Sequence, residues 1–208
     1  MIAIPERGIY LASRSPRRRE LLTQIGVRFH LLLFRERPGE GPDVDEISLP
    51  SELPDIYVER VAKTKADAGW RRMQQRNLPL APVLAADTTV AVDGKILAKP
   101  LDRGDAQRMI EQLSGRTHEV LTAVALKHHD WMECVLSRSE VKFKPLSARE
   151  IEQYVASGEG DDKAGAYAIQ GRAARFVVEL RGSYSGVMGL PLYETSQLLD
   201  KLRGRHPY

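Results

Sequence analysis

Residues 11–22 of the chain read LASRSPRRRELL, and this stretch predicts a strand, a serine-rich turn and a helix in close succession. Residues 9–11 are apolar and favour a buried, extended chain. Ser15 suits the N-cap of a helix, Pro16 suits its first position, and Gly26 is a typical end. We therefore predict a strand that ends at residue 11 and a helix that begins at residue 16.

Three consecutive arginines, residues 17–19, occupy the first turn of this predicted helix. A helix N-terminus carries roughly +0.5 of an elementary charge, so cations there are disfavoured by roughly 0.3–1 kcal/mol each. The free N–H groups, the hydroxyls of Ser13 and Ser15 and the guanidinium groups would all bind an anion with several oxygens, such as a polyphosphate. A solvated basic start of a helix is the alternative interpretation.

The composition is that of one soluble globular chain. It has 208 residues, 42% hydrophobic and 28% charged, and we predict a single domain over residues 1–208. The net charge of +3 is spread along the chain, so we expect no stable nucleic-acid partner. The single cysteine, Cys134, excludes an internal disulfide, and no segment resembles a signal peptide or a membrane span. We expect a cytoplasmic protein that does not bind membranes.

Strand and helix patterns alternate along the chain, which is typical of the α/β class. Strands are expected at residues 27–34, 83–86, 90–92, 96–97, 119–127, 132–143 and 176–180. Helices are expected at residues 54–70 and 102–113, after a capping box at 147–150, and from residue 191 onward, with loops or connectors at 39–53, 71–79 and 183–189. Asp93-Gly94 predicts a hairpin, and the long antiparallel pair at 119–143 argues for a mixed sheet.

A few residues outside the arginine turn are candidates for chemistry. Asp87 follows an apolar strand, where a carboxylate suits metal binding or activation of a water, although such aspartates often only cap turns. Lys99 and Lys163 lie next to small or rigid residues, and the alternative for either is a solvated surface charge, the usual role of a lysine. Gln170 precedes Gly171, which would allow close approach of a ligand; a turn residue is the alternative.

Five segments, in chain order, resemble the motifs of the Maf family of nucleotide pyrophosphatases. They are residues 13–22, 86–90 with 94–100, 113–118, 162–171, and 182–192. The departures are modest: Ala98 stands where the family usually has glycine, Gly186 replaces a common asparagine, and Thr64 replaces a common acidic residue. Only Asp45-Glu46 is familiar in the longer region from residue 39 to 54.

This resemblance implies both a fold and an activity. The fold would be α/β, a mixed sheet with two lobes around a central cleft, similar to the inosine-triphosphate pyrophosphatase architecture. The activity would be hydrolysis of a nucleoside triphosphate to the monophosphate and pyrophosphate. Asp162-Lys163-Ala164-Gly165 and Ile169-Gln170-Gly171 match the pyrimidine-preferring branch, so dTTP and UTP are the expected substrates. The resemblance also implies a homodimer.

The resemblance further implies roles for single residues. Asp87 would be the proton acceptor or a metal-bound base. The phosphates would be bound by Ser13, Arg17, Arg18, Lys65, Lys99 and Lys163. Arg17, Thr88 and Gln170 would tune specificity. A divalent cation, Mg²⁺ or Mn²⁺, is expected because the charge of a triphosphate is large for a few side chains alone.

Two other functions fit the same motifs. One is a pyrophosphatase that prefers a modified or purine nucleotide. The other is a nucleotide-binding regulator of septum formation without catalytic activity. Asp87 separates the last alternative from an enzyme, because a carboxylate beside phosphates repels them unless a cation intervenes, and a pure binder has no need of it.

Overall fold

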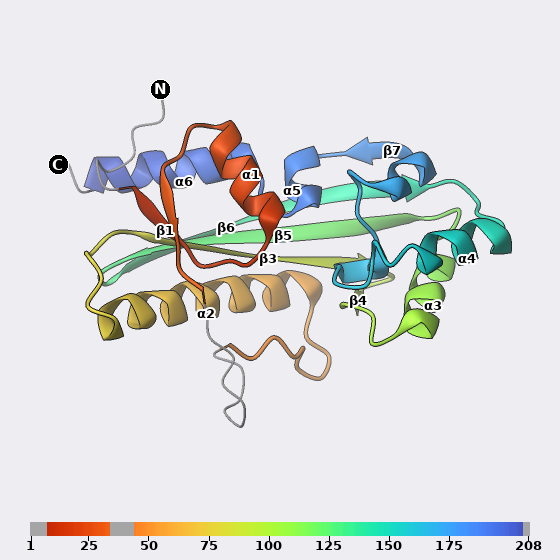
Figure 1. Cartoon of the computed structure of the whole chain (residues 1–208), viewed down its shortest axis with the longest axis horizontal. Coiled ribbons are helices and arrows are strands. Elements are labelled where there is room, and N and C mark those ends of the chain that lie inside the picture. The colour runs from red at the N-terminus through yellow and green to blue at the C-terminus, as the bar shows by residue number, and fades with distance from the viewer. Residues whose placement is uncertain (1–7, 34–43, 206–208) are drawn as a thin grey trace.

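A mixed sheet forms the centre of the computed structural model, which describes residues 8–33 and 44–205 (Figure 1). The strands are β1 (Ile9–Leu11), β2 (Phe29–Leu31), β3 (Val83–Val92), β4 (Lys95–Leu97), β5 (Thr117–His128), β6 (Trp131–Phe143) and β7 (Val177–Arg181). Their order is β2-β1-β3-β5-β6-β7, with β4 also paired to β3. β1 runs parallel to β2 and to β3, and the other pairs are antiparallel, as the sequence predicts for a mixed sheet.

Helices surround this sheet. They are α1 (Pro16–Gln24), α2 (Pro54–Gln75), α3 (Arg103–Leu113), α4 (Ala148–Ala156), α5 (Tyr184–Met188) and α6 (Leu192–Arg205), with short 3₁₀ helices η1 (Ala164–Ala166) and η2 (Arg172–Phe176). The predicted capping box of α4 is present, with Ser147 and Glu150 each accepting from the other's backbone N–H. The predicted start of α1 at residue 16 is confirmed.

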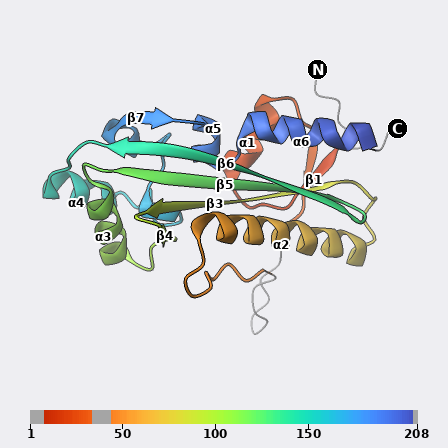
Figure 2. The same cartoon turned by 180° about the vertical axis from the view of Figure 1, so that it is seen from behind.

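The alternation of side chains along β3 decides which helix covers which face. Val83 and Ala85 pack with Val58, Val61 and other residues of α2. Leu84 and Ala86 point the other way and pack with α1 and α6. Figure 2 shows the result, with α2 along one side of β3, β5 and β6 and with α1 and α6 on the other.

A further apolar cluster fills the end of the sheet that lies away from the termini (Figure 1). There Val90 and Val120 pack with α3, α4 and η2, and the aromatic members include Phe143 and Phe176, whose ring centroids lie 6.0 Å apart. The two ends of the long strands therefore carry different sets of helices.

The structure corrects several predicted boundaries. The strand expected at 27–34 is β2, residues 29–31, and Phe34 lies outside the described residues, as do residues 39–43 of the predicted loop. The helix expected at 54–70 continues to residue 75, because Met73 is fully buried and the first positive φ after the start of α2 is at Asn77. The runs at 83–86 and 90–92 belong to one strand, β3.

The segment at 183–189, predicted as a loop, contains the one-turn helix α5. Ser183 caps it, with its hydroxyl accepting from the N–H of Gly186 at 2.9 Å. In the part of the chain described here, no helix is both long and apolar enough to cross a membrane.

Candidate active site

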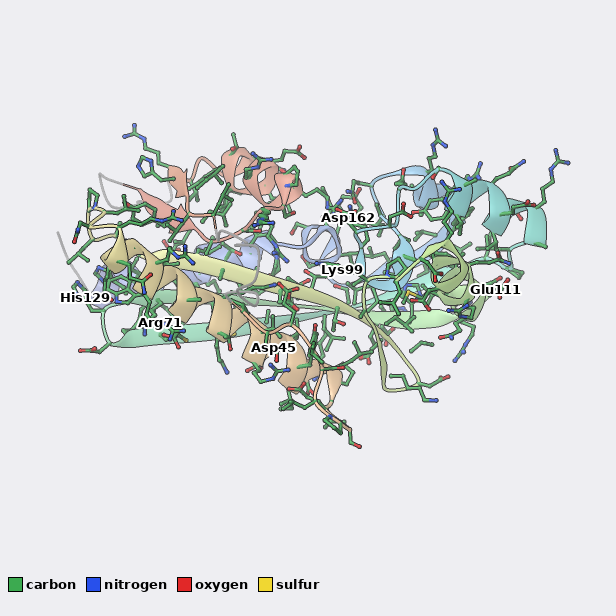
Figure 3. The ribbon with its side chains drawn as sticks, turned by 60° about the horizontal axis from the view of Figure 1, so that its bottom comes forward. Asp45, Arg71, Lys99, Glu111, His129 and Asp162 are labelled. Carbon is green, nitrogen blue, oxygen red and sulfur yellow. The ribbon has the colours of Figure 1, made fainter. Side chains whose placement is uncertain are left out.

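A cavity of about 520 Å³ opens at the middle of the molecule, within the range usual for small-molecule sites. All nine predicted site residues line it: Ser13, Arg17, Arg18, Lys65, Asp87, Thr88, Lys99, Lys163 and Gln170. Figure 3 shows two lining residues, Lys99 and Asp162, in the central part of the molecule, with His129 and Glu111 toward opposite ends. The structure thus brings together residues that the sequence disperses over 158 positions, from 13 to 170.

An interruption in the edge of the sheet makes room for this cavity. On one side, β3 pairs with β1 only at Val83 and Leu84, and with β4 only from Val90 onward. Between these pairings, the edge of β3 that carries Asp87 and Thr88 has no neighbouring strand among the described residues. Since β1 has ended and its chain turns into α1 at this point, side chains from both faces of the sheet reach one pocket. Ligands in open α/β sheets commonly bind outside the carboxyl ends of the strands, and the carboxyl end of β1 lies beside this gap.

The serine–arginine turn forms one wall. The N–H of Ser15 donates to the Ser13 hydroxyl at 3.2 Å, which fixes the turn. Ser15 occupies the N-cap position as predicted, but its side chain makes no capping hydrogen bond. The first turn of α1 therefore lacks the usual side-chain acceptor, a condition that suits an anion. Burial lowers the pKa of the Arg17 guanidinium at this wall, and the charge of Glu20 opposes the shift.

Arg18 joins three separate segments. Its Nε donates to the carbonyl oxygen of Gly189 at 2.8 Å, Nη1 to the Ser13 hydroxyl at 3.2 Å, and Nη2 to the Thr88 hydroxyl at 3.2 Å. Burial lowers the pKa of the Arg18 guanidinium overall, and the charges of Asp87 and Glu46 partly offset this shift. A solvated basic helix start is therefore wrong for Arg18. Three of its five N–H groups bind these partners, and among residues 8–33 and 44–205 the other two remain for a ligand.

Lys65 lies between two carboxylates. Its Nζ is 2.7 Å from Asp87 Oδ1 and 2.9 Å from Glu46 Oε1. Asp87 is only 7% exposed, on the face of β3 that α2 covers, and α2 supplies Lys65. A second lysine, Lys99, places its Nζ 3.7 Å from Glu46 Oε2. The candidate base is thus held by a partner that the helix positions.

Glu46 is a pocket residue that the sequence analysis did not assign to the site. Burial alone would raise its pKa, but Lys65 and then Lys99 and Arg18 hold the pKa below its usual value. The backbone carbonyl of Glu46 accepts from the Tyr57 hydroxyl at 2.9 Å, which ties this segment to α2. Apart from the family resemblance of Asp45-Glu46, nothing in the sequence separates Glu46 from the other acids of its loop.

Thr88 faces away from Asp87 and makes protein contacts. Besides accepting from Arg18, its hydroxyl lies 3.0 Å from that of Thr122, which donates to the carbonyl oxygen of Gly186 at 2.8 Å. Thr88 therefore connects β3 to β5 and α5 while lining the pocket.

The segment 162–170 forms another part of the lining. Lys163 forms an ion pair with Asp162, and its pKa falls to about 8 because of burial and the nearby charges of Arg17 and Lys99. Gly165 has a φ of +66°, and a Cβ there would lie 2.9 Å from the side chain of Val90. Glycine is thus needed for the close packing of this segment against β3. Gln170 is exposed at its end.

One part of the pocket is apolar. Val90 and Val120 are cross-strand partners in β3 and β5, and they line the cavity with Ile169, Val187 and Met188. These side chains continue into the apolar cluster at the α3–α4 end. The cavity therefore combines a cationic part with an apolar part, the combination that a nucleotide requires.

The acidic groups of the pocket are few. Over residues 8–33 and 44–205, no group of three or more histidine, cysteine, aspartate or glutamate side chains is arranged to hold a metal ion. Asp87 and Glu46, which share Lys65, supply two carboxylates. Magnesium is typically bound by one or two carboxylates together with substrate phosphates, so this donor set fits a cation that arrives with its nucleotide.

Comparison with known proteins gives a consistent result. The model of the family described as "Maf-like protein" matches residues 8–202. A relative in Nitrosomonas europaea, named dTTP/UTP pyrophosphatase, is 58% identical over 201 residues, 97% of each chain. One in Aromatoleum aromaticum with the same name is 61% identical over 194 residues, 92% of this chain and 94% of the relative.

A solved structure, that of the Staphylococcus aureus Ham1 protein, resembles the fold. The TM-score is 0.51 at 13% sequence identity, and the alignment covers 95% of this chain and 99% of the other. At this identity the likeness concerns the fold alone, and it confirms the predicted mixed α/β architecture.

Proposed function

Because the chain belongs to the Maf-like protein family, we propose that it hydrolyses dTTP and UTP to the monophosphate and pyrophosphate. The observation that carries this proposal is one cavity in which Asp87, held 2.7 Å from Lys65, shares the space with Arg17, Lys99 and Lys163. The relatives named dTTP/UTP pyrophosphatase support the choice of substrates.

The cationic walls suit the triphosphate. Arg17 and Lys163 come from different segments of the lining, and burial lowers the pKa of each. The charges of Arg17 and Lys99 lower the pKa of Lys163 further, so an anion beside these groups would stabilise their charged forms. Ser13 and the first turn of α1 add hydrogen-bond donors beside them. Such fixed donors neutralise charge on the leaving pyrophosphate without having to reorganise.

Asp87 is the proton acceptor in this mechanism. A water molecule attacks the α-phosphorus, a new oxygen–phosphorus bond forms, and the bond to the pyrophosphate oxygen breaks. The proton of the water passes to the Asp87 carboxylate. Lys65 orients that carboxylate, and Glu46 balances the charge of Lys65 on its other side. General-base catalysis of this kind typically contributes roughly 10²–10⁴-fold.

Asp87 and Glu46 are the residues that would hold Mg²⁺ or Mn²⁺. When bound, the cation would neutralise phosphate charge and polarise the phosphoryl oxygens. In the chain itself, Lys65 then counters the repulsion between the two carboxylates.

The apolar side accommodates the base. Val90, Val120 and Ile169 offer a surface for a pyrimidine ring, and Gln170 stands next to Ile169. A glutamine amide has both a donor and an acceptor, which match the carbonyl and ring N–H of uracil or thymine. A homodimer and a cytoplasmic location remain predictions.

A coupled phosphate-release assay tests the proposal. Purified protein would be supplied with dTTP, UTP, CTP, ATP or GTP and Mg²⁺, with and without added inorganic pyrophosphatase. We expect phosphate from dTTP and UTP only when pyrophosphatase is present, because the direct product is pyrophosphate. Phosphate release without the coupling enzyme, or equal rates with all five nucleotides, would contradict the proposal.

A further inference from the structure

Two residues outside the cavity make hydrogen bonds to the segment that carries Gln170. Tyr154 lies on α4 and is only 1% exposed. Its hydroxyl accepts from the N–H of Ala168 at 3.2 Å and donates to Glu159 Oε1 at 3.1 Å. The other carboxylate oxygen, Glu159 Oε2, accepts from the N–H of Arg172 at 2.9 Å. These bonds join separate segments rather than neighbouring turns of one helix.

These bonds bracket Gln170 symmetrically. Ala168 lies two residues before it and Arg172 two residues after it, and both are held by the same Tyr154–Glu159 pair. Between them, the N–H of Gly171 donates to the carbonyl oxygen of Ala168 at 3.0 Å, which closes a turn. The position of the Gln170 backbone is therefore fixed from both sides, although its own side chain is exposed.

Gly171 shows how closely the pair approaches the turn. A Cβ at this position would lie 2.4 Å from the carboxyl group of Glu159. Any other residue would have to displace the carboxylate or the turn. From the sequence, Gly171 is expected to allow close approach of a ligand, whereas in the structure the carboxylate of Glu159 occupies this space.

We propose that Tyr154 and Glu159 are positioning residues, which hold residues 168–172 so that Gln170 meets the edge of the pyrimidine base. This inference rests on the proposed function. Neither residue lines the cavity, so their effect on the substrate passes through the turn. The pair should govern the choice between bases and should leave the chemistry at Asp87 largely unchanged.

Tyr154→Phe is the variant that isolates this role. It removes the hydroxyl, and with it the bonds to Ala168 and Glu159, but keeps the ring that stacks edge-on against Phe176 with centroids 5.3 Å apart. Glu159→Gln is a milder change, because the amide keeps one acceptor for either the Tyr154 hydroxyl or the Arg172 N–H.

Ser147→Ala provides the matched control. Ser147 caps the same helix that carries Tyr154, and its side chain bonds to Glu150 rather than to residues 168–172. The control variant therefore weakens α4 without touching the turn. Each protein would be assayed for kcat and KM with dTTP, UTP and CTP, and hydrogen exchange would be followed in peptides that cover residues 164–176.

We expect Tyr154→Phe to raise KM for dTTP and UTP and to reduce their preference over CTP by about five- to tenfold, with kcat within about threefold of wild type. Glu159→Gln should lie between wild type and Tyr154→Phe. Exchange in the turn should rise in both variants and stay unchanged in Ser147→Ala, which should also retain the wild-type preference.

Three results would overturn the inference. A wild-type preference in Tyr154→Phe would do so, whether or not exchange in the turn rises. An equal loss of preference in Ser147→Ala would show that only the stability of α4 matters. A wild-type protein that does not prefer dTTP and UTP would refute the proposed function itself, and the inference would fall with it.

Discussion

Replacing Asp87 by asparagine removes the proposed base while almost preserving its shape. The side chain is 7% exposed, and its oxygen accepts a hydrogen bond from Lys65 at 2.7 Å. The amide that replaces the carboxylate has no basic oxygen, so a water in the cavity loses its proton acceptor. The geometry predicts a defect chiefly in kcat at saturating Mg²⁺, because the cations that face the phosphates remain, whereas one of the two carboxylates that would hold Mg²⁺ is lost.

The magnitude follows from the contacts. Loss of a general base costs about 10²–10⁴-fold in kcat, which is about 3–5 kcal/mol of activation free energy. The cost in folding stability is smaller, about 1–2 kcal/mol, because the amide oxygen still accepts from Lys65 and Glu46 still lies 2.9 Å from that lysine. For a chain of this size we expect the Tm to fall by about 2–8 °C.

Steady-state kinetics with dTTP and thermal unfolding of the same preparation measure both quantities. Asp67→Asn is the matched control, since Asp67 lies 2.9 Å from Lys127 in an ion pair that does not line the cavity. That variant should lose little stability and keep its kcat. If Asp87→Asn keeps a kcat within about tenfold of wild type, below the loss expected for a general base, Asp87 is not the base.

Three further changes test other parts of the site and of the fold. Arg18→Ala removes a partly buried cation and its three hydrogen bonds, so we expect a loss of about 2–4 kcal/mol in folding stability and a lower kcat/KM. Arg19→Ala, which lies outside the cavity, should change neither quantity. Unchanged urea unfolding of Arg18→Ala would refute this prediction. In wild type we expect kcat/KM for dTTP and UTP to exceed that for CTP by about ten- to hundredfold, and Gln170→Ala should reduce this ratio while retaining hydrolysis. An unchanged ratio would mean that Gln170 is only a turn residue. Burial lowers the pKa of His118 to about 4 from 6.5. As the pH falls from 6.5 toward 4, the unfolded state therefore binds more protons than the folded state, and folding stability decreases. Urea unfolding should show about 2 kcal/mol of loss from this group between about pH 7 and pH 5, and His118→Gln should flatten that dependence; equal slopes would contradict it.

Local signals in the sequence predict the elements that depend on local chemistry. Ser15-Pro16 fixes the start of α1, Asp93-Gly94 closes the β3–β4 hairpin, and the capping box at Ser147 begins α4, all as predicted. The family resemblance adds the set of residues that lines the cavity. Their roles in binding and catalysis remain predictions.

The rest depends on contacts between distant segments, which no local pattern encodes. Arg18 binds the carbonyl oxygen of Gly189, 171 positions away, and this bond helps to fix the end of the unpredicted helix α5. Glu46 becomes part of the site only because Lys65 of α2 lies between it and Asp87.

The most direct test of the account is hydrolysis of dTTP in water enriched in ¹⁸O. Attack on the α-phosphorus predicts one ¹⁸O atom in the dTMP formed and none in the pyrophosphate, both read by mass spectrometry with pyrophosphatase left out. Label in the pyrophosphate, or formation of dTDP and labelled phosphate, would place the attack on another phosphorus and contradict the account.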